Sequence, residues 1–526
     1  MRSAKLQLSF DPQLPHPARP WANPVVPGDH PDPTIIRVGR TFWASATSGE
    51  WSPQFPLFRS SDLSRWETAG AVFPMQPAWA DGSFWAPELV HDELSDRYFC
   101  WYVAHKRGGN LCIAVATAEA AQGPYTDHGP LVCEDDGSID PCFARDEHGE
   151  PYLIWKEDGN SVGRPTPIWA QRLTEDMLHL EGERVELIRN DSPWEAGVVE
   201  GPYILRRRGW FYMFYAGNSC CGRECKYAEG VARSQKLLGP WEKCPANPIV
   251  GANDSWRCPG HGTAVRTSGQ RDQPAQDYLL YHAYPAQGTI YVGREAVLDE
   301  ILWSEDEPNG APGWPVINSG KGPAQPPSAQ PMIDFIDEFR HARLGPAWQW
   351  PVNTHPDVHL GRGSLTLRIP ESSPLSAKPV ESAMLAVPRP ASNHYQATVL
   401  LTVAGPPDPR LWAGLAIVGD PFNTIGLGLR GDDLILWERR GNTQRDVWRT
   451  GFPGNRNVWL RATSIGSEHH LHFAWSTDEH VWHTAGEQYD ASDLPAWDRG
   501  LRIGLMLEGP LGTAASYHSF ELRAQP

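Results

Sequence analysis

The first 300 residues alternate between short apolar runs rich in aromatic side chains and turns rich in Gly and charged residues. Alternating, β-branched or aromatic runs that are bounded by turn residues predict β-strands. Five aromatic runs share this pattern, and a further strand-like run follows each of them. They are residues 41–47 (TFWASAT), 98–104 (YFCWYVA), 151–157 (PYLIWKE), 210–217 (WFYMFYAG) and 278–284 (YLLYHAY).

The five runs form a repeat, because their first residues are separated by 57, 53, 59 and 68 positions. Four strands with tight turns in about 40–50 residues are typical of a propeller blade, and longer loops lengthen the period. A four-stranded sheet cannot bury both faces alone, so the repeats are expected to pack face to face around an axis. We predict an all-β chain whose residues 20–303 form a five-bladed β-propeller. A solenoid is the alternative, although its periods are usually shorter and more regular.

The rest of the chain has a different pattern. Residues 304–331 are dense in Pro and Gly and predict a linker or a surface strap. Residues 332–526 carry closely spaced strand-like runs with turns between them. This pattern predicts an antiparallel β-sandwich as a second domain.

Charge and composition restrict the possible partners. The 526 residues contain 46 Lys and Arg against 63 Asp and Glu, a net charge of −17. Phosphate backbones and anionic lipids would repel such a chain, so neither nucleic acid nor a membrane is expected as a partner. Residues 1–17 lack the apolar core of a secretory signal, which favours a cytoplasmic location unless a leader has been removed. Nine cysteines cannot all pair within one chain, which agrees weakly with a reducing compartment.

Candidate chemistry lies where the innermost strand of each predicted blade begins. The strand before each aromatic run should line the central channel, with its first residues near one end of the axis. A single Asp or Glu is ordinarily a solvated surface residue. Acids at the same position of several repeats, however, would converge on one site, and clustered carboxylates mark active sites. The residues at these positions are Asp32, Trp85 with Glu88, Asp140, Glu200 and His261.

Paired carboxyl groups indicate glycoside hydrolysis. One must be protonated to donate a proton to the leaving oxygen, and the other must be ionised to activate water or attack carbon. A third acid nearby can hold the two in opposite protonation states. Trp outnumbers both Tyr and Phe (24 against 15 and 16), and indole faces stack well on sugars. A Trp-rich β core would give the same count.

Five motifs between about residues 23 and 303 resemble those of glycoside hydrolase family 43, in the same order. The resemblance implies a five-bladed propeller that hydrolyses β-xylosides or α-L-arabinofuranosides with inversion. It implies that Asp32 is the general base, that Glu200 is the general acid, and that Asp140 tunes and orients the acid. Inversion predicts a separation of about 6.5–9.5 Å between the two reacting carboxyl groups. The motifs are HPDP (30–33), FWAPEL (84–89), SIDP (138–141), EGPY (200–203) and PGHGT (259–263).

The same resemblance extends to further residues. It implies that His261 lies at the channel centre, linked through water to Ca²⁺ or a similar ion. Calcium prefers oxygen ligands, however, and one imidazole does not make a calcium site. Trp85 would be a platform for the sugar ring, with blade packing as the alternative. For Glu88 the alternative is a structural role alone. Arg294 would reach the catalytic base and the sugar. His30, Trp85, His261 and Arg294 are therefore the expected substrate-binding residues.

Three cysteines follow the fourth aromatic run, in the segment NSCCGREC (218–225). Zinc would need a second pair at regular spacing, which Cys244 and Cys258 do not supply. Free thiols in a loop are expected, with a disulfide between Cys220 and Cys221 as the alternative.

Residues 337–350 (DEFRHARLGPAWQW) resemble the start of the concanavalin-like domain that follows some family propellers. Such a domain binds saccharide or shapes the active-site rim, and the second role is favoured here. We therefore predict an exo-acting glycosidase that releases L-arabinofuranose or D-xylose from hemicellulose fragments. The alternatives are a non-catalytic carbohydrate-binding propeller, an endo-acting arabinanase-like hydrolase, and a fructose-transferring propeller. The last would hold its carboxylates about 5–5.5 Å apart.

Overall fold

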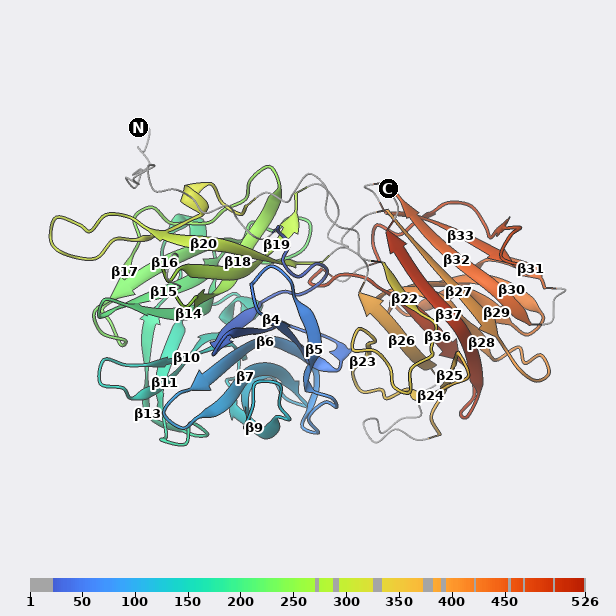
Figure 1. The fold of residues 1–526 in the computed structure, drawn as a ribbon, viewed down its shortest axis with the longest axis horizontal. Coiled ribbons are helices and arrows are strands. Elements are labelled where there is room, and N and C mark those ends of the chain that lie inside the picture. Colours follow the sequence, from blue (N-terminus) through green and yellow to red (C-terminus); the bar gives the residue numbers. More distant parts are fainter. Residues whose placement is uncertain are drawn as a thin grey trace. The chain divides into compact units, whose positions relative to one another are not determined.

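The computed structural model describes residues 22–269, 274–286, 293–324, 334–371, 382–388, 394–420, 422–452, 456–466, 469–494 and 497–524. The predictions for residues 1–17 and for the end of the linker, 325–331, lie outside these ranges. The described chain divides into two compact units, and Glu50–Ser52 together with Arg294 fall in the second (Figure 1). No helix among the described residues combines the length and apolar character needed to cross a membrane.

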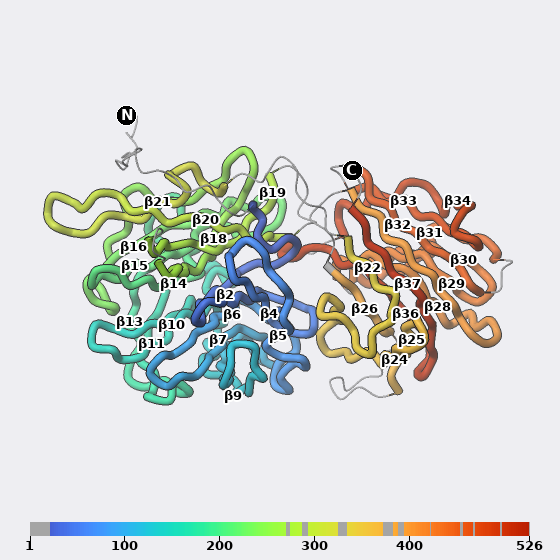
Figure 2. The backbone as a smooth tube through the Cα atoms, in the orientation of Figure 1, coloured from blue at the N-terminus to red at the C-terminus, as the bar shows by residue number. Residues whose placement is uncertain are grey.

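The first unit consists of five antiparallel sheets, each made of four strands that follow one another along the chain. In Figure 2 the colour advances in order through these sheets, from blue to yellow-green. The first sheet contains β1 (Thr34–Val38), β2 (Thr41–Ser45), β4 (Gln54–Ser60) and β5 (Glu67–Phe73). The second contains β6 (Ala80–Asp92), β7 (Arg97–Lys106), β8 (Leu111–Ala118) and β9 (Thr126–Val132).

The remaining three sheets repeat the pattern. The third contains β10 (Ser138–Arg145), β11 (Pro151–Glu157), β12 (Ile168–Leu173) and β13 (Leu180–Ile188). The fourth contains β14 (Val199–Arg207), β15 (Trp210–Gly217), β16 (Ala228–Ser234) and β17 (Glu242–Lys243). The fifth contains β18 (Trp256–Arg266), β19 (Asp277–Pro285), β20 (Glu295–Trp303) and β21 (Pro315–Ile317). Short 3₁₀ turns occur at Gly159–Val162, Pro193–Glu195 and Asn318–Gly320.

The first strands of the five sheets form a closed ring. β1 contacts β6, β6 contacts β10, β10 contacts β14, β14 contacts β18, and β18 contacts β1. The start of the described chain joins the last blade, because Val26 bridges to Ala296 in β20 and Asn23 exchanges hydrogen bonds with the main chain of Leu298. The prediction of a five-bladed propeller with these strands innermost is confirmed.

The aromatic runs supply the apolar layers between blades. Phe214 from β15, for example, packs in one cluster with Trp256 of β18 and Leu279 of β19. The same cluster buries Trp314, which is 1% exposed, and the residues after it form the outermost strand β21. The prediction that residues 304–331 are only a linker is therefore wrong for Pro315–Ile317. The surrounding Pro and Gly obscured a short apolar strand that completes the fifth blade.

The second unit is a sandwich of two antiparallel sheets, as predicted. The larger sheet has the order β24-β25-β37-β27-β32-β33-β34, with β22 on β37 and β35 on β33. Its strands are β22 (Phe335–Asp337), β24 (Asp357–Gly361), β25 (Ser364–Arg368), β27 (Tyr395–Thr402), β32 (Asn457–Ile465), β33 (His470–Ser476), β34 (His483–Thr484), β35 (Tyr489–Asp490) and β37 (Ala514–Ala524).

The smaller sheet has the order β26-β36-β28-β29-β30-β31, and a separate pair joins β3 to β23. Along β28 nearly every residue is buried. The strands are β3 (Trp51–Ser52), β23 (Trp350–Pro351), β26 (Ser382–Pro388), β28 (Trp412–Asp420), β29 (Asn423–Arg430), β30 (Asp433–Arg440), β31 (Thr443–Gly451) and β36 (Arg502–Glu508).

The expectation of free thiols after β15 is wrong. Cys220 is bonded to Cys221, and Cys225 is bonded to Cys258 in β18. The loop between β15 and β16 brings Cys225 within 5.9 Å of Cys258, measured between Cα atoms, although 33 residues separate them. A third disulfide joins Cys112 to Cys133, and three buried cysteines remain free: Cys100, Cys142 and Cys244.

Candidate active site

A residue with a left-handed backbone conformation lies within four of the innermost strands and two residues before the fifth, β1. Four of these strands also shift register there, as β-bulges do. Bulges redirect side chains beside active sites, and a non-Gly residue in this conformation costs on the order of 1–3 kcal/mol. The five residues, with their φ angles, are Asp32 (53°), Ala86 (43°), Asp140 (56°), Gly201 (58°) and His261 (51°).

These interruptions bring side chains from four blades together. Nδ1 of His261 lies 3.4 Å from Oδ1 of Asp32 and 3.9 Å from Oδ2 of Asp140. The same Oδ2 accepts a hydrogen bond from the main-chain N–H of Gly201, the neighbour of Glu200, at 2.9 Å. The side chains of the three acids and His261 are only 8–13% exposed. Asp32, Asp140 and Glu200, which are far apart in the sequence, thus converge around one imidazole.

Asp32 is held from both neighbouring blades. The hydroxyl of Thr47 donates to Oδ2 at 2.7 Å and itself accepts a hydrogen bond from the N–H of Ala86 at 2.7 Å. The N–H of Asp32 donates to Nδ1 of His282 in β19 at 3.0 Å. The Asp32 carboxylate is therefore fixed in orientation.

Glu200 is engaged through both carboxylate oxygens. The ammonium of Lys156 lies 2.7 Å from Oε2, and the hydroxyl of Tyr227 donates to Oε1 at 2.8 Å. The Tyr227 ring stacks on His282 with 5.6 Å between centroids and an interplanar angle of 7°. Since His282 also contacts Asp32, the two candidate reacting carboxyl groups are positioned by one connected set of side chains.

The electrostatics separate the protonation states of these groups. Burial raises the pKa of Asp140 to about 6. The negative charges of Glu200 and Asp32 also raise this pKa, whereas the positive charge of His261 lowers it. Burial opposes ionisation of Glu200, but Lys156 and Tyr227 outweigh it and hold the pKa of this carboxyl below its usual value. The carboxylates of Asp140 and Asp32 overcome burial and raise the pKa of His261 to about 9. The pKa values of Asp140 and Glu200 therefore move in opposite directions, and Glu200 is mainly ionised at neutral pH in the free protein.

Two further carboxyl groups are fully buried near His261. Burial raises the pKa of Glu88 to about 8, against the hydrogen bond that Thr34 donates to its Oε2 at 3.1 Å. Burial likewise raises the pKa of Glu229 in β16 to about 8. Both groups are therefore mainly protonated at neutral pH and add little negative charge to the site.

The other predicted binding residues are placed differently. The His30 ring packs edge-on against Phe58, 4.9 Å between centroids. Trp85 is partly buried and packs against the core cluster shared by the second and third blades, so a packing role is present. Arg294 belongs to the second unit, where its Nη2 donates to the carbonyl of Asp498 at 3.2 Å. The contacts described for Arg294 do not join it to the three acids, and sugar binding by these residues stays a prediction.

The residues around His261 do not fit a directly coordinated metal ion. Within the described ranges no group of three His, Cys, Asp or Glu side chains could hold one. Nδ1 of His261 instead faces two carboxylates, and the raised pKa makes this side chain cationic at neutral pH. Calcium takes six to eight oxygen ligands. An ion linked to His261 only through water stays a prediction.

Three residues of the site were not singled out from the sequence: Lys156, Tyr227 and His282. A signal was available for two of them. Lys156 and His282 interrupt the otherwise apolar runs PYLIWKE and YLLYHAY, and a charged or polar side chain buried in such a strand needs a partner. Tyr227 carries no comparable signal, because it lies in a loop.

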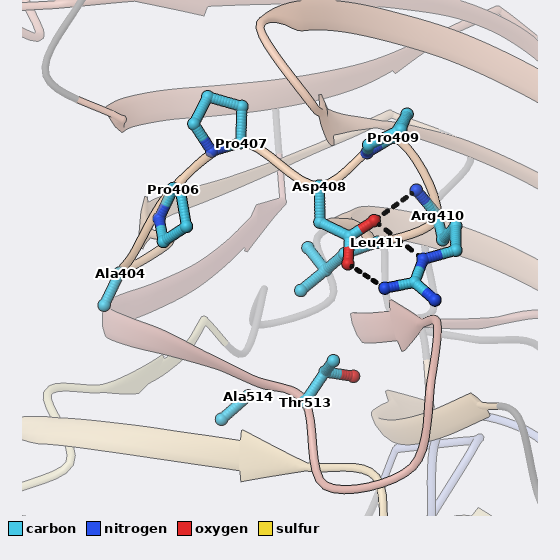
Figure 3. Close-up of a pocket in the computed structure, with 9 residues that line it drawn as sticks. All are labelled: Ala404, Pro406, Pro407, Asp408, Pro409, Arg410, Leu411, Thr513 and Ala514. Atoms are coloured by element: carbon cyan, nitrogen blue, oxygen red, sulfur yellow. Dashed lines mark hydrogen bonds and ion pairs between the residues drawn. The ribbon is translucent and has the colours of Figure 1, made fainter.

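The second unit contains an open hollow of about 570 Å³ without paired acids (Figure 3). The figure shows Asp408 facing Arg410, whose Nη2 donates to Oδ2 of Asp408 at 2.9 Å. Among the described residues that line this hollow, Asp408 is the one carboxylate, and its partner is Arg410. This hollow therefore lacks the groups for acid–base chemistry.

Gly201 offers a test of the packing in the propeller site. A Cβ at this position would lie 2.8 Å from Cγ of His261, on a backbone with φ of +58°. Gly201→Ala is expected to destabilise the protein by about 2–4 kcal/mol and to displace His261 from the acids. Thermal unfolding and kcat/KM would measure both effects. The control is Gly197→Ala, since nothing lies within 4 Å of the added Cβ there. Equal effects of the two substitutions would contradict the prediction.

Two protein-family models match the chain. The model of the family described as "Glycosyl hydrolases family 43" matches residues 21–308, and that of "Beta xylosidase C-terminal Concanavalin A-like domain" matches residues 336–520. The chain is similar to a xylosidase/arabinosidase from Butyrivibrio fibrisolvens, with 28% identity over 57% of this chain and 57% of that protein. It is also similar to a xylan 1,3-beta-xylosidase from a Vibrio species, with 28% identity over 57% and 58%. The chain thus spans less than three fifths of the length of these two relatives.

Solved structures share the fold over both units. The GH43 BlXynB protein from Bacillus licheniformis superposes with a TM-score of 0.80 and 24% identity, over 96% of this chain and all of that chain. The xylan beta-1,4-xylosidase from Bacillus halodurans C-125 gives a TM-score of 0.77 and 21% identity over the same shares. At these identities the likeness establishes the fold. Because the family model matches residues 21–308, more than half of the chain, the chain belongs to glycosyl hydrolase family 43.

Proposed function

We propose that this protein is an inverting, exo-acting glycosidase that releases L-arabinofuranose or D-xylose from hemicellulose-derived saccharides. The observation that carries the proposal is the convergence of Asp32, Asp140 and Glu200 around His261 in a nearly buried site. A carbohydrate-binding propeller would need neither a fixed carboxylate pair nor a third acid with a raised pKa.

In this proposal Asp32 is the general base and Glu200 the general acid. Asp32 would take a proton from the attacking water while Glu200 gives one to the departing glycosidic oxygen. Asp140 accepts a hydrogen bond from the N–H of Gly201, so it holds the segment that carries Glu200. Its negative charge, when present, disfavours ionisation of Glu200 and thereby favours the acid form. The cationic His261 keeps the three acids within one compact cluster.

The choice of pentose and of exo action in this proposal rests on the names of similar proteins. The names of the Butyrivibrio and Vibrio proteins refer to xylosidase and arabinosidase activity. A Cellvibrio japonicus relative, 24% identical, is named an exo-acting α-1,5-L-arabinofuranosidase. A Bacillus subtilis relative, 22% identical, is named an endo-arabinanase, which makes endo action the alternative to test. Pentose preference depends on pocket contacts worth about 1–3 kcal/mol.

The direct test compares nitrophenyl α-L-arabinofuranoside with nitrophenyl β-D-xyloside and follows the first-formed anomer by NMR. Inversion and release of single pentoses from linear oligosaccharides are expected. Retention would favour the double-displacement mechanism and carboxylates about 5–5.5 Å apart. Internal cleavage of linear arabinan would favour endo action. No turnover of either glycoside, with saccharide binding retained, would favour the non-catalytic propeller.

Calcium linked to His261 through water is also part of the proposal. If such an ion binds the folded protein and not the unfolded chain, it raises the stability. Treatment with EDTA is then expected to lower the melting temperature, and added Ca²⁺, but not Mg²⁺, should restore it. Identical melting curves before and after EDTA would contradict calcium binding.

A further inference from the structure

Lys156 is a buried cation that the acid–base scheme above does not use. It lies near the end of β11, with a side chain that is 1% exposed. Its ammonium is 2.7 Å from Oε2 of Glu200 and 2.8 Å from Oδ1 of Asp158. A charge removed from water in this way persists only when partners compensate it. Lys156 is therefore built into the blade as the partner of these two carboxylates.

The chemistry of the two partners of Glu200 makes its oxygens unequal. An ammonium has three donors and no acceptor, so a proton on the oxygen that it faces would weaken that contact, because a carboxyl O–H oxygen accepts less strongly than a carboxylate oxygen. A phenol hydroxyl both donates and accepts, so Tyr227 can face Oε1 in either protonation state. The hydrogen bond from Tyr227 to Oε1 is 2.8 Å long. The proton for the leaving group is thus favoured on Oε1 of Glu200 over Oε2.

We propose that Lys156 is a positioning residue that anchors Oε2 of Glu200 and confines the catalytic proton to Oε1. This inference rests on the proposed function of Glu200 as the general acid. When Oε1 delivers its proton to the glycosidic oxygen, the glycosidic C–O bond breaks and Glu200 becomes a carboxylate. Lys156 stabilises that carboxylate and so strengthens the acid in the transition state.

The charged groups facing Glu200 set the direction of the pH effect. Lys156 and His261 favour its ionised form, and Tyr227 donates to that form, whereas Asp140 disfavours it. Lys156 is the nearest of these charges. Loss of its charge therefore raises the pKa of Glu200, so the acid stays protonated to higher pH while becoming weaker.

The test is Lys156→Met, assayed on two aryl glycosides of the released pentose. The phenol of the phenyl glycoside needs a proton in order to leave. With this substrate the alkaline limb of the kcat/KM profile should move to higher pH by at least about 1 unit, and kcat should fall at least about 10-fold. With the dinitrophenyl glycoside, whose dinitrophenolate leaves without a proton, kcat should change less than about 3-fold. Lys156→Arg retains the charge and should restore the limb. The control is Lys236→Met, because Lys236 is exposed on the same unit.

Asp158→Asn provides an independent variant that leaves the ammonium in place. Its loss of negative charge should leave the alkaline limb where it is or move it to lower pH, opposite to Lys156→Met. An upward shift in both variants would point to general loosening of the blade and would overturn the inference. An unshifted limb in Lys156→Met would overturn it as well.

A thermal double-mutant cycle separates this inference from the proposed function, because it needs no turnover. Lys156→Met should lower the melting temperature by about 5–10 °C in the wild-type chain and clearly less in the Glu200→Gln background. If the wild-type protein hydrolyses neither glycoside, the proposed function fails, and the anchoring of Oε2 is still judged by the cycle. If the protein is active and the two substitutions are additive, the function stands and the role of Lys156 is overturned.

Discussion

Asp32→Asn is expected to lower kcat about 10²–10⁴-fold on both the phenyl and the dinitrophenyl glycoside. The physical reason is that an amide cannot take a proton from the attacking water, and general-base catalysis contributes an effect of this size. Because water attacks in the rate-limiting step whatever the leaving group, the loss should be similar for both substrates. Stopped-flow or end-point release of the phenol measures it, with substrate binding followed separately by calorimetry.

Thr47→Val serves as the comparison for Asp32. It removes the 2.7 Å hydrogen bond to Oδ2 without removing the carboxylate, so a smaller loss, about 10-fold, is expected. The Asp32→Asn protein should unfold at nearly the wild-type temperature, since the amide preserves the shape of the side chain. Turnover within about 3-fold of wild type in Asp32→Asn would remove Asp32 from the role of general base.

Glu200→Gln should produce a loss that depends on the leaving group. A glutamine cannot protonate the glycosidic oxygen, so hydrolysis of the phenyl glycoside and of oligosaccharides should fall about 10²–10⁴-fold. The dinitrophenyl glycoside, which needs no proton for departure, should lose much less. The measurement is the loss of kcat, relative to wild type, on each of the two glycosides. In Glu200→Gln the loss should be much larger on the phenyl glycoside, whereas in Asp32→Asn the two losses should be nearly equal.

Glu186→Gln is the matched control for this substitution. Glu186 lies on β13 of the third blade and pairs with the neighbouring Arg189, which is largely exposed. Removing one partner of such a surface pair changes stability by about 0–1 kcal/mol, and kcat should be unchanged. Equal losses of Glu200→Gln on both glycosides would contradict its role as the general acid.

Much of the fold follows from local pattern. Five aromatic runs at regular spacing predict five blades, because each sheet needs neighbours on both faces. The prediction fails at Pro315–Ile317, where Pro and Gly on both sides obscure a strand of three residues that Trp314 anchors in the core. It fails also at Cys225 and Cys258, since a disulfide requires two loops to meet. Contacts between loops that are distant in the sequence form only in the folded chain.

The residue types of the candidate site were likewise evident in the amino-acid order, at the start of each inner strand. Asp32, Asp140, Glu200 and His261 occupy equivalent repeat positions, and a propeller brings equivalent positions to one end of its axis. The sequence did not show the burial, the contacts or the protonation of each of these side chains. The low exposure, the 2.7 Å contact of Lys156 with Glu200 and the stacking of Tyr227 on His282 arise between different blades.

The amino-acid sequence by itself determined that this chain is a propeller followed by a sandwich, and that three acids recur at its inner strands. Periodicity and turn residues act over a few positions, so they can be identified along the chain. Only the tertiary structure decided which oxygen of Glu200 faces Lys156, which thiols pair, and why the pKa values of Asp140 and Glu200 move apart. Those properties depend on distance and on exclusion of water, and both are set by segments that meet only when the ring of blades closes.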